Sequence, residues 1–235
     1  MAISVDDVYK TVLLILNKEQ RGYITPTEFN KIATQVQREI FEGYFQYENK
    51  QYRIPDNESE YSDRSKSTDE KIAIFKQRSL ALATGIDPTY GTYFIHPADF
   101  YKLGTVIYND REVQRVQEND FLYVDMSPLT KPSENYPIYL YRDNDLYVKP
   151  ISIQSGVSIS YLKKPADVVW AYTVDPTSGG YVYDAGSSTD IELHQVEQTE
   201  VIIKILMYAG VVIRDPQIVQ TAAQMDQQET IQENS

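Results

Sequence analysis

The sequence contains no cysteine, and this absence removes several kinds of chemistry. A chain without thiols forms no disulfide bonds, offers no thiolate to a metal ion and has no cysteine nucleophile. Histidine is almost as scarce, because His96 and His194 are the only two and lie far apart in the sequence. A zinc site would require both to converge with carboxylates. We therefore interpret each histidine as a surface or packing residue.

Long hydrophobic runs are also missing. The best candidate, residues 201–212, is interrupted by Lys204 and is shorter than the roughly 18 apolar residues that a membrane span needs. The first residues carry no basic stretch ahead of an apolar core, so a secretory signal is not expected. We expect no contact with a membrane, and we expect residues 201–212 to form a buried helix.

Motifs for phosphate binding and acyl transfer are absent from the sequence. No glycine-rich turn joins a predicted strand to a helix, and there is no GxSxG elbow. The acidic runs 56–60 and 68–70 could supply the paired carboxylates of a virion-associated glycosidase, which we keep as an alternative. They lie in a polar segment and are more typical of a solvated surface. The prediction is a protein that is not an enzyme and has no cofactor.

Acidic residues outnumber basic ones by 34 to 22, which gives a formal net charge of -12. Such a chain is repelled by nucleic acid at long range, so specific DNA binding is not expected. The sequence also has 20 tyrosines against 7 phenylalanines and one tryptophan, Trp170. Tyrosine combines a large apolar ring with a polar tip, which suits half-exposed strands and surfaces that bind partners.

The residues before position 50 carry the periodicity of two amphipathic helices. Ser4 precedes the first, and two aspartates favour its positively polarised start. In the second helix Thr25 is the predicted N-cap, Pro26 takes the first helical position and Glu28 completes a capping box. The apolar positions are Val5, Val8, Val12, Leu13 and Leu16 in the first helix, and Phe29, Ile32, Ala33, Val36, Ile40, Phe41, Tyr44 and Phe45 in the second.

Residues 49–71 are polar and predict a long loop or arm, after which Ser67 and Glu70 could cap a short helix. From 89 to 183 short apolar runs alternate with turn signals, which predicts antiparallel strands in a small sandwich or barrel. The expected strands are 90–95, 102–108, 112–116, 121–124, 138–141, 146–148, 156–162 and 168–174.

Helical periodicity returns at residues 190–209, with a stop expected at Gly210 and another helix starting at Asp215-Pro216. The fold class predicted is α+β: an N-terminal helical pair, a central antiparallel β-rich domain and a C-terminal helical pair with a polar tail. The expected domains are N-terminal helices at 1–50, a polar arm and short helix at 51–88, the β-rich domain at 89–187, and C-terminal helices and tail at 188–235.

The segment from Asn17 to Glu28 is similar to an EF-hand loop, with glycine at its sixth position and glutamate at its twelfth. Calcium needs six to eight oxygen ligands. Neutral Asn17, the longer Glu19 and the cation Arg21 occupy positions where acidic or oxygen ligands belong. Asn17, Glu19 and Glu28 are thus weak metal candidates, and helix capping explains the same residues without an ion. A calcium-binding, EF-hand-like module remains an alternative function.

The order of these zones resembles the adaptor, or tail tubular protein A, class of head-to-tail connector proteins in tailed phages. The N-terminal block is most similar to virion ring proteins of crAss-like phages. The likeness covers nearly the whole chain, with loose motifs. The segments that carry it are VDDVYKTVLLILNKEQRGYITPTEFN, FIHPADFYKL, DLYVKPISIQSGVSISYLKKP and ELHQVEQTEVIIKILMYAGVVIRDP.

The resemblance implies a ring-forming structural subunit of the virion neck, made in the bacterial host cytoplasm. Its implied partners are further copies of itself, usually twelve in a ring, the portal protein and other neck or tail ring proteins. DNA would pass through the lumen without specific binding. Another virion part, such as a head completion protein or a tail fibre attachment, is a further alternative.

The family's helical parts pack against neighbours, and this assigns assembly contacts to the C-terminal helices. The helix at residues 200–212 is apolar on more than one face, which is typical of a helix buried on two sides. The candidate interface residues are Val201, Ile205, Tyr208, Val212, Ile218 and Met225.

Overall fold

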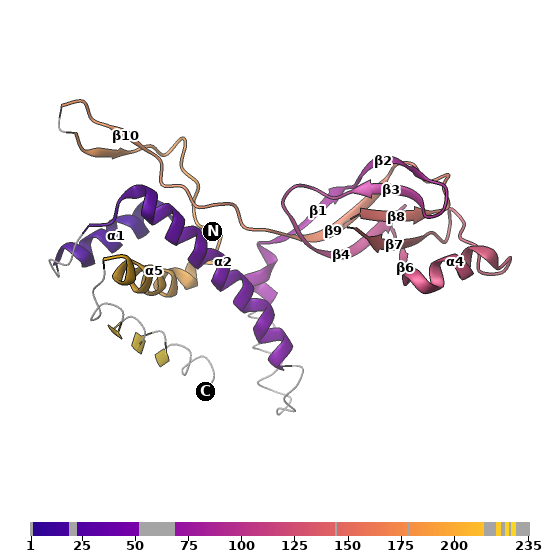
Figure 1. Cartoon of the computed structure of the whole chain (residues 1–235), viewed down its shortest axis with the longest axis horizontal. Coiled ribbons are helices and arrows are strands. Elements are labelled where there is room, and N and C mark those ends of the chain that lie inside the picture. Colours follow the sequence, from indigo (N-terminus) through magenta and orange to yellow (C-terminus); the bar gives the residue numbers. More distant parts are fainter. Residues whose placement is uncertain are drawn as a thin grey trace. The chain divides into compact units, whose positions relative to one another are not determined.

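The computed structural model describes residues 2–18, 23–51, 69–143, 145–177 and 179–213, and helical pieces at 220–221, 224–225 and 227–228. The chain divides into two compact units, which Figure 1 shows in the colours of the sequence. Residues 1–74 and 165–235 form one, here called the helical unit, and residues 75–164 form the other, the β unit. No helix in these described ranges is long and apolar enough to cross a membrane.

The helical unit is built from α1 (Val5–Lys18), α2 (Pro26–Gln51), the short η1 (Gln195–Glu197) and α5 (Gln198–Ile213). Each long helix turns one apolar stripe inward, at the spacing of three to four residues that the helical repeat requires. The two N-terminal helices were predicted, with α2 beginning at Pro26 as expected. The buried side chains are Val5, Val8, Val12 and Leu16 of α1, Phe29, Ala33, Val36 and Ile40 of α2, and Val201, Ile205 and Ala209 of α5.

A capping box begins α2, as the sequence predicts. The Thr25 backbone N–H donates to Glu28 Oε2 at 2.9 Å, and the Thr25 hydroxyl donates to the same oxygen at 2.6 Å. In return the Glu28 N–H donates to Thr25 Oγ1 at 3.3 Å. At the other end of the unit, the expected stop at Gly210 is wrong, because α5 continues to Ile213.

The β unit contains two sheets. In the first, β1 (Lys76–Leu80), β9 (Val157–Lys163), β4 (Phe100–Tyr108) and β5 (Arg111–Glu112) lie in the order β1-β9-β4-β5. In the second, β2 (Leu82–Asp87), β3 (Gly91–Ile95), β8 (Asp145–Lys149), β7 (Ile138–Arg142) and β6 (Gln114–Arg115) lie in the order β2-β3-β8-β7-β6. All of these pairs are antiparallel except the short β6–β7 pair.

The two sheets share one hydrophobic core, as in a β-sandwich. Val106 and Ile159 of the first sheet belong to the same buried cluster as Phe94, Tyr139 and Val148 of the second. Together with the helices before and after this region, the sheets confirm the α+β class. Strands β1 and β2, one in each sheet, lie within residues 51–88, for which the sequence predicted an arm and a short helix.

The predicted strand 121–124 is wrong, because these residues lie in the helix α4 (Glu118–Met126). The predicted strand 168–174 is correct only for its last three residues, 172–174. α4 packs on the outer side of the second sheet, where Phe121 joins Ile138 and Leu140 in a separate cluster. Tyr139, between those two, points into the sandwich core, as the alternation of strand side chains requires. One sheet therefore has apolar residues on both faces.

An extended segment, residues 165–171, follows the β unit and lies along α2. Asn30, Thr34 and Gln37, on one stripe of α2, bond its backbone in place of a neighbouring strand. The amide of Asn30 accepts from the Trp170 N–H at 2.8 Å and donates to the Trp170 carbonyl at 3.3 Å. Thr34 Oγ1 accepts from the Val168 N–H at 3.0 Å. We call residues 165–171 the strap.

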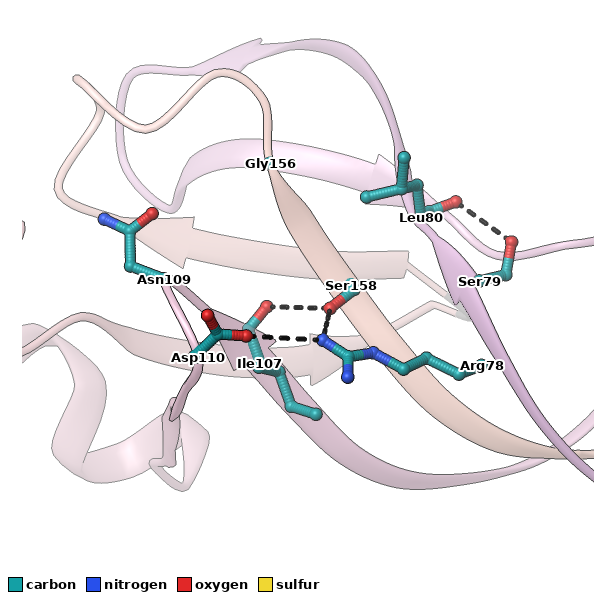
Figure 2. Close-up of a pocket in the computed structure, with 8 residues that line it drawn as sticks. All are labelled: Arg78, Ser79, Leu80, Ile107, Asn109, Asp110, Gly156 and Ser158. Carbon is teal, nitrogen blue, oxygen red and sulfur yellow. Dashed lines mark hydrogen bonds and ion pairs between the residues drawn. The ribbon is translucent and has the colours of Figure 1, made fainter.

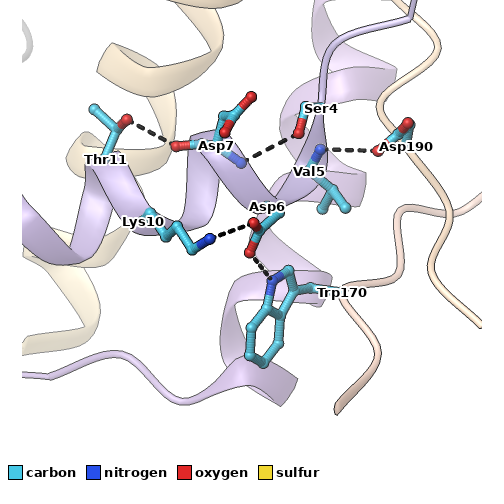
Figure 3. Close-up of polar contacts among 8 residues, drawn as sticks. All are labelled: Ser4, Val5, Asp6, Asp7, Lys10, Thr11, Trp170 and Asp190. Carbon is cyan, nitrogen blue, oxygen red and sulfur yellow. Dashed lines mark hydrogen bonds and ion pairs between the residues drawn. The ribbon is translucent and has the colours of Figure 1, made fainter. Parts of the chain in front are cut away.

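The strap and the chain after it are also fastened to α1, as Figure 3 shows. The Trp170 indole N–H donates to Asp6 Oδ1 at 3.1 Å, and Asp190 Oδ1 accepts from the Val5 N–H at 3.0 Å. Asp190 therefore satisfies an N-terminal amide of α1 from the far end of the sequence. These contacts join the start of α1 to residues 170 and 190 in one folded unit.

Candidate assembly surfaces

The predicted interface residues of α5 do not form one surface. Val201 and Ile205 are fully buried in the core of the helical unit, which corrects their assignment to a contact with a neighbour. Tyr208 is half-buried, and its hydroxyl donates to Glu39 Oε2 at 2.9 Å. The sequence showed that α5 is apolar on several sides but not which side packs within the chain.

The remaining predicted residues are placed only in part. Val212 lies in α5, Ile218 lies outside the described residues, and Met225 is exposed. The helical pieces that include Met225 agree in type with the helix expected after Asp215.

The three metal candidates, Asn17, Glu19 and Glu28, do not form a site in the described structure. Asn17 is exposed near the end of α1, and Glu19 lies outside the described residues. The hydrogen bonds that Thr25 donates lower the pKa of the Glu28 carboxyl, so this carboxylate is occupied in capping α2. Within the described ranges no group of three or more histidine and acidic side chains could hold a metal ion.

The histidines have local structural contacts. The His96 ring stacks on Phe100 with centroids 4.3 Å apart. His194 Nδ1 accepts from the Val196 N–H at 3.3 Å and so caps η1. The acidic run 56–60 lies outside the described residues, as does Thr68, whereas Asp69 and Glu70 are exposed.

A β-hairpin projects from the helices of its unit (Figure 1). It consists of β10 (Tyr172–Val174) and β11 (Tyr181–Tyr183). Tyr172 pairs with Tyr183 and Val174 with Tyr181, so these four side chains share one face. We call this face, at residues 172, 174, 181 and 183, the hairpin face. Sequence reasoning assigned its residues to the β-rich domain.

Aromatic rings join the hairpin face to the core of the helical unit. The Trp170 ring lies 4.5 Å from Tyr9 and 5.7 Å from Tyr183, centroid to centroid. Burial is the largest cause that raises the pKa of the Tyr9 hydroxyl, so this group stays neutral. Exposure increases along the row, from 5% at Trp170 to 57% at Val174. The hairpin is thus anchored at its base and uncovered toward its tip.

A second exposed apolar region lies in the β unit, on α4 and the loop after it. Tyr123 and Met126 are exposed on the helix, and Leu129 and Tyr136 are exposed in the loop after it. Leu129 has 97% of its surface accessible. Exposed apolar side chains that form one patch are typical of contact surfaces, so we take residues 123–136 as a candidate assembly surface.

A hollow of about 370 Å³ lies on the outer side of the sheet β1-β9-β4-β5 (Figure 2). Its lining includes Arg78, Leu80, Ile107, Asp110 and Ser158, and we call it the sheet hollow. Arg78 donates to Ser158 Oγ at 3.3 Å and approaches Asp110 Oδ1 at 3.9 Å. The hollow is open to solvent and does not enclose a small molecule.

Comparison with known proteins leaves the family of this chain open. No family model matches the sequence, and no curated protein is significantly similar to it.

Proposed function

We propose that this chain is a ring-forming structural subunit of the head-to-tail connector of a tailed bacteriophage. In this role copies of the chain join the portal protein to the next ring or tail protein in the virion neck. Their shared lumen gives DNA a passage.

The observation that carries the proposal is the exposure of apolar and aromatic side chains on segments that project from a well-packed core. Tyr181 and Val182 are exposed on the hairpin, Met126 is exposed at the end of α4, and Leu129 is exposed in the loop that follows. Tyrosine and methionine are enriched where proteins contact each other. A chain with two such segments can give one surface to each of two neighbours, as a ring requires.

The charge of the chain supports the same role. A formal net charge of -12 disfavours adhesion to polyphosphate, which suits a protein that DNA passes without binding. The order of elements along the chain agrees with the resemblance to connector proteins, since helices precede and follow a β-rich middle.

Electron cryomicroscopy of the intact phage particle that encodes this chain tests the proposal. We expect density for the α1, α2 and α5 helices and for the β-sandwich in a symmetric ring at the portal vertex. Density for this fold elsewhere in the particle, or its absence from the particle, would overturn the connector assignment. Mass spectrometry of purified particles is the matched control, because it determines whether the chain is present at all.

A further inference from the structure

We propose that the β10–β11 hairpin of one copy pairs edge to edge with the hairpin of a neighbouring copy. Hydrogen bonds between the two backbones would join the hairpins into one continuous antiparallel sheet. This inference rests on the proposed function, since it names the contact that would join subunits in the ring. The partner at each hairpin edge is thus a second copy of this chain.

The hydrogen bonds within the hairpin determine which of its backbone groups point outward. At the base, the Asp184 N–H donates to the Ala171 carbonyl at 2.9 Å. At the tip, the Asp175 N–H donates to the Gly180 carbonyl at 2.9 Å. Opposite residues in an antiparallel pair alternate between bonded and non-bonded, so the residue pairs next to these two turn their N–H and C=O groups away from each other. The outward groups are those of Tyr172 and Val174 on one edge and of Tyr181 and Tyr183 on the other.

Both edges are open, because no hydrogen bond among the described residues reaches these outward groups. The two strands also contain no lysine, proline or bulge, which are features that protect an edge from pairing. The sandwich edge strands β1 and β2 are protected in these ways. β1 carries Lys76 and Arg78, and β2 has a bulge between Ala83 and Gly85. The hairpin edges are therefore better suited to pair with another strand.

The hairpin also exposes apolar side chains on both of its faces. Val174 is exposed on the hairpin face and Val182 on the opposite face. Trp170 supports the base, where its ring stacks on Tyr172 and Tyr183. A two-stranded hairpin is marginally stable by itself, and further strands stabilise it. Strands added at its edges would bury apolar surface toward the tip.

A second copy supplies the matching edge. When two hairpins lie side by side at the same height, β11 of one is antiparallel to β10 of the next, because the strands of each hairpin run in opposite directions. Tyr183 then lies opposite Tyr172 of the next copy, and Tyr181 opposite its Val174. All four residues have outward backbone groups. The same pairing occupies both edges of every hairpin, whereas one strand from another protein would leave an edge open.

The paired strands carry no charge, although each copy has a formal net charge of -12. Residues 172–174 and 181–183 contain no acidic or basic side chain. Asp175 follows β10 at the tip and Asp184 follows β11 at the base, so in this register they lie at opposite ends of the paired strands. Like charges directly opposite each other destabilise a strand pair, and this register avoids them.

The contact is heterologous, because β11 of one copy meets β10 of the next. Repeated contacts of this kind close into a ring when the rotation between copies permits it. Closure of the ring leaves no hairpin with an open edge. The hairpins would then form one closed band of strands that belongs to all subunits.

A proline at position 174 tests the backbone pairing in the full-length protein. The N–H of Val174 points outward, so Val174→Pro removes a donor from the β10 edge and leaves the bonds within the hairpin in place. The matched variant, Val174→Thr, keeps this N–H and a β-branched side chain. Trp170 fluorescence and circular dichroism establish that each variant is folded.

Sedimentation velocity over a concentration series measures self-association, and amide hydrogen exchange measures protection of the outward N–H groups. We expect Val174→Pro to associate at least about tenfold more weakly than wild type and Val174→Thr. At a concentration ten times the dissociation constant, the outward amides of wild type should exchange about tenfold more slowly than in the monomer. A monomeric wild type, equal association of the two variants, or outward amides that do not slow would each overturn the pairing.

The absence of cysteine allows the arrangement of the edges to be tested directly. A Val174→Cys protein is mixed with a mass-tagged Tyr181→Cys protein and oxidised. A disulfide forms readily only when the two Cα atoms approach to about 4.4–6.8 Å, so pairing of β10 with the neighbouring β11 favours the mixed product. A predominance of the two unmixed disulfides would overturn this arrangement, since each strand would then pair with the same strand of another copy.

The two proposals fail separately. Hairpin pairing in a protein that is absent from the virion neck would refute the connector assignment and leave the pairing intact. A ring at the neck whose subunits associate equally well with Val174→Pro would refute the hairpin pairing alone.

Discussion

Gln37 shows how a single buried polar residue can join distant parts of the chain. Only 1% of its surface is accessible, yet both ends of its amide are used. Its Nε2 donates to the Ala166 carbonyl at 2.6 Å, and its Oε1 accepts from the Glu192 N–H at 2.8 Å. One side chain of α2 thus holds the strap and the segment that leads into α5.

Replacing Gln37 with alanine should destabilise the helical unit by about 1–3 kcal/mol, because the buried side chain is lost and two part-buried backbone groups lose their partner. The measurement is urea unfolding followed by the fluorescence of Trp170, the only tryptophan. Gln35→Ala is the matched control, since Gln35 is exposed on the same helix. Equal midpoints for the two variants would contradict the role assigned to Gln37.

Glu28 should make the stability of the helical unit depend on pH. Hydrogen bonds from the Thr25 hydroxyl and N–H lower its pKa in the folded state below the value of 4.5 expected when unfolded. The stabilisation is therefore complete above pH 4.5 and is lost as the pH falls through the folded-state pKa. Glutamine carries no charge to titrate.

The stability difference between wild type and Glu28→Gln should accordingly shrink as the pH falls below 4.5. Urea midpoints measured across the acid range test this, with Glu42→Gln, an exposed carboxylate of the same helix, as the control. A difference that stays constant with pH would exclude a contribution from the charge.

At the scale of elements, α4 holds its sheet through one aromatic side chain. Phe121 is fully buried, stacks on Tyr90 with centroids 6.1 Å apart, and lies under the Lys149 Nζ at 5.0 Å. Phe121→Ala should cost about 3–5 kcal/mol and release α4 from the sheet. We expect faster hydrogen exchange at the α4 amides, whereas Tyr123→Ala, at a side chain 73% exposed, should leave them unchanged. Unaltered exchange in Phe121→Ala would show that other contacts hold the helix.

The same element shows where sequence reasoning fails. Phe121, Leu122 and Val124 form a short apolar run. Periodicity alone cannot show whether a run this short is a strand or a helix. The run becomes helical because Phe121 and Val124, three residues apart, meet one sheet face. By contrast α1 and α2 were predictable, since their apolar stripes are long and the capping box of α2 is local.

The candidate surfaces were predictable to a smaller extent. The apolar character of α5 was visible, but the choice of Val201 and Ile205 as its inward residues depends on packing against α1 and α2. Of the hairpin, β10 falls within the predicted strand 168–174, whereas its membership in the helical unit was not predictable because it depends on the strap. Asn30, Thr34 and Gln37 at helical spacing were a signal for the strap, since polar residues in one stripe of a buried helix need partners.

At the scale of the whole molecule, the β unit interrupts the helical unit in the sequence. Residues 75–164 form a continuous piece with its own core, so we expect this fragment to fold alone. The fragment 1–74 should not, because α5 and the strap supply the other half of its core and its hydrogen bonds. Circular dichroism and urea unfolding of both fragments test this. A cooperative transition in 1–74, or none in 75–164, would contradict the division.

The interrupted order has a consequence for synthesis on the ribosome. α1 and α2 emerge first, but α5, which covers their apolar stripes, begins only at Gln198. At usual rates of translation this delay is on the order of ten seconds. During that time the β unit can complete its sandwich while Phe29 and Val36 still lack their final partners. The nascent chain therefore has a folded β unit before α1 and α2 are enclosed, and the apolar stripes of these two helices are the surface that a chaperone would bind.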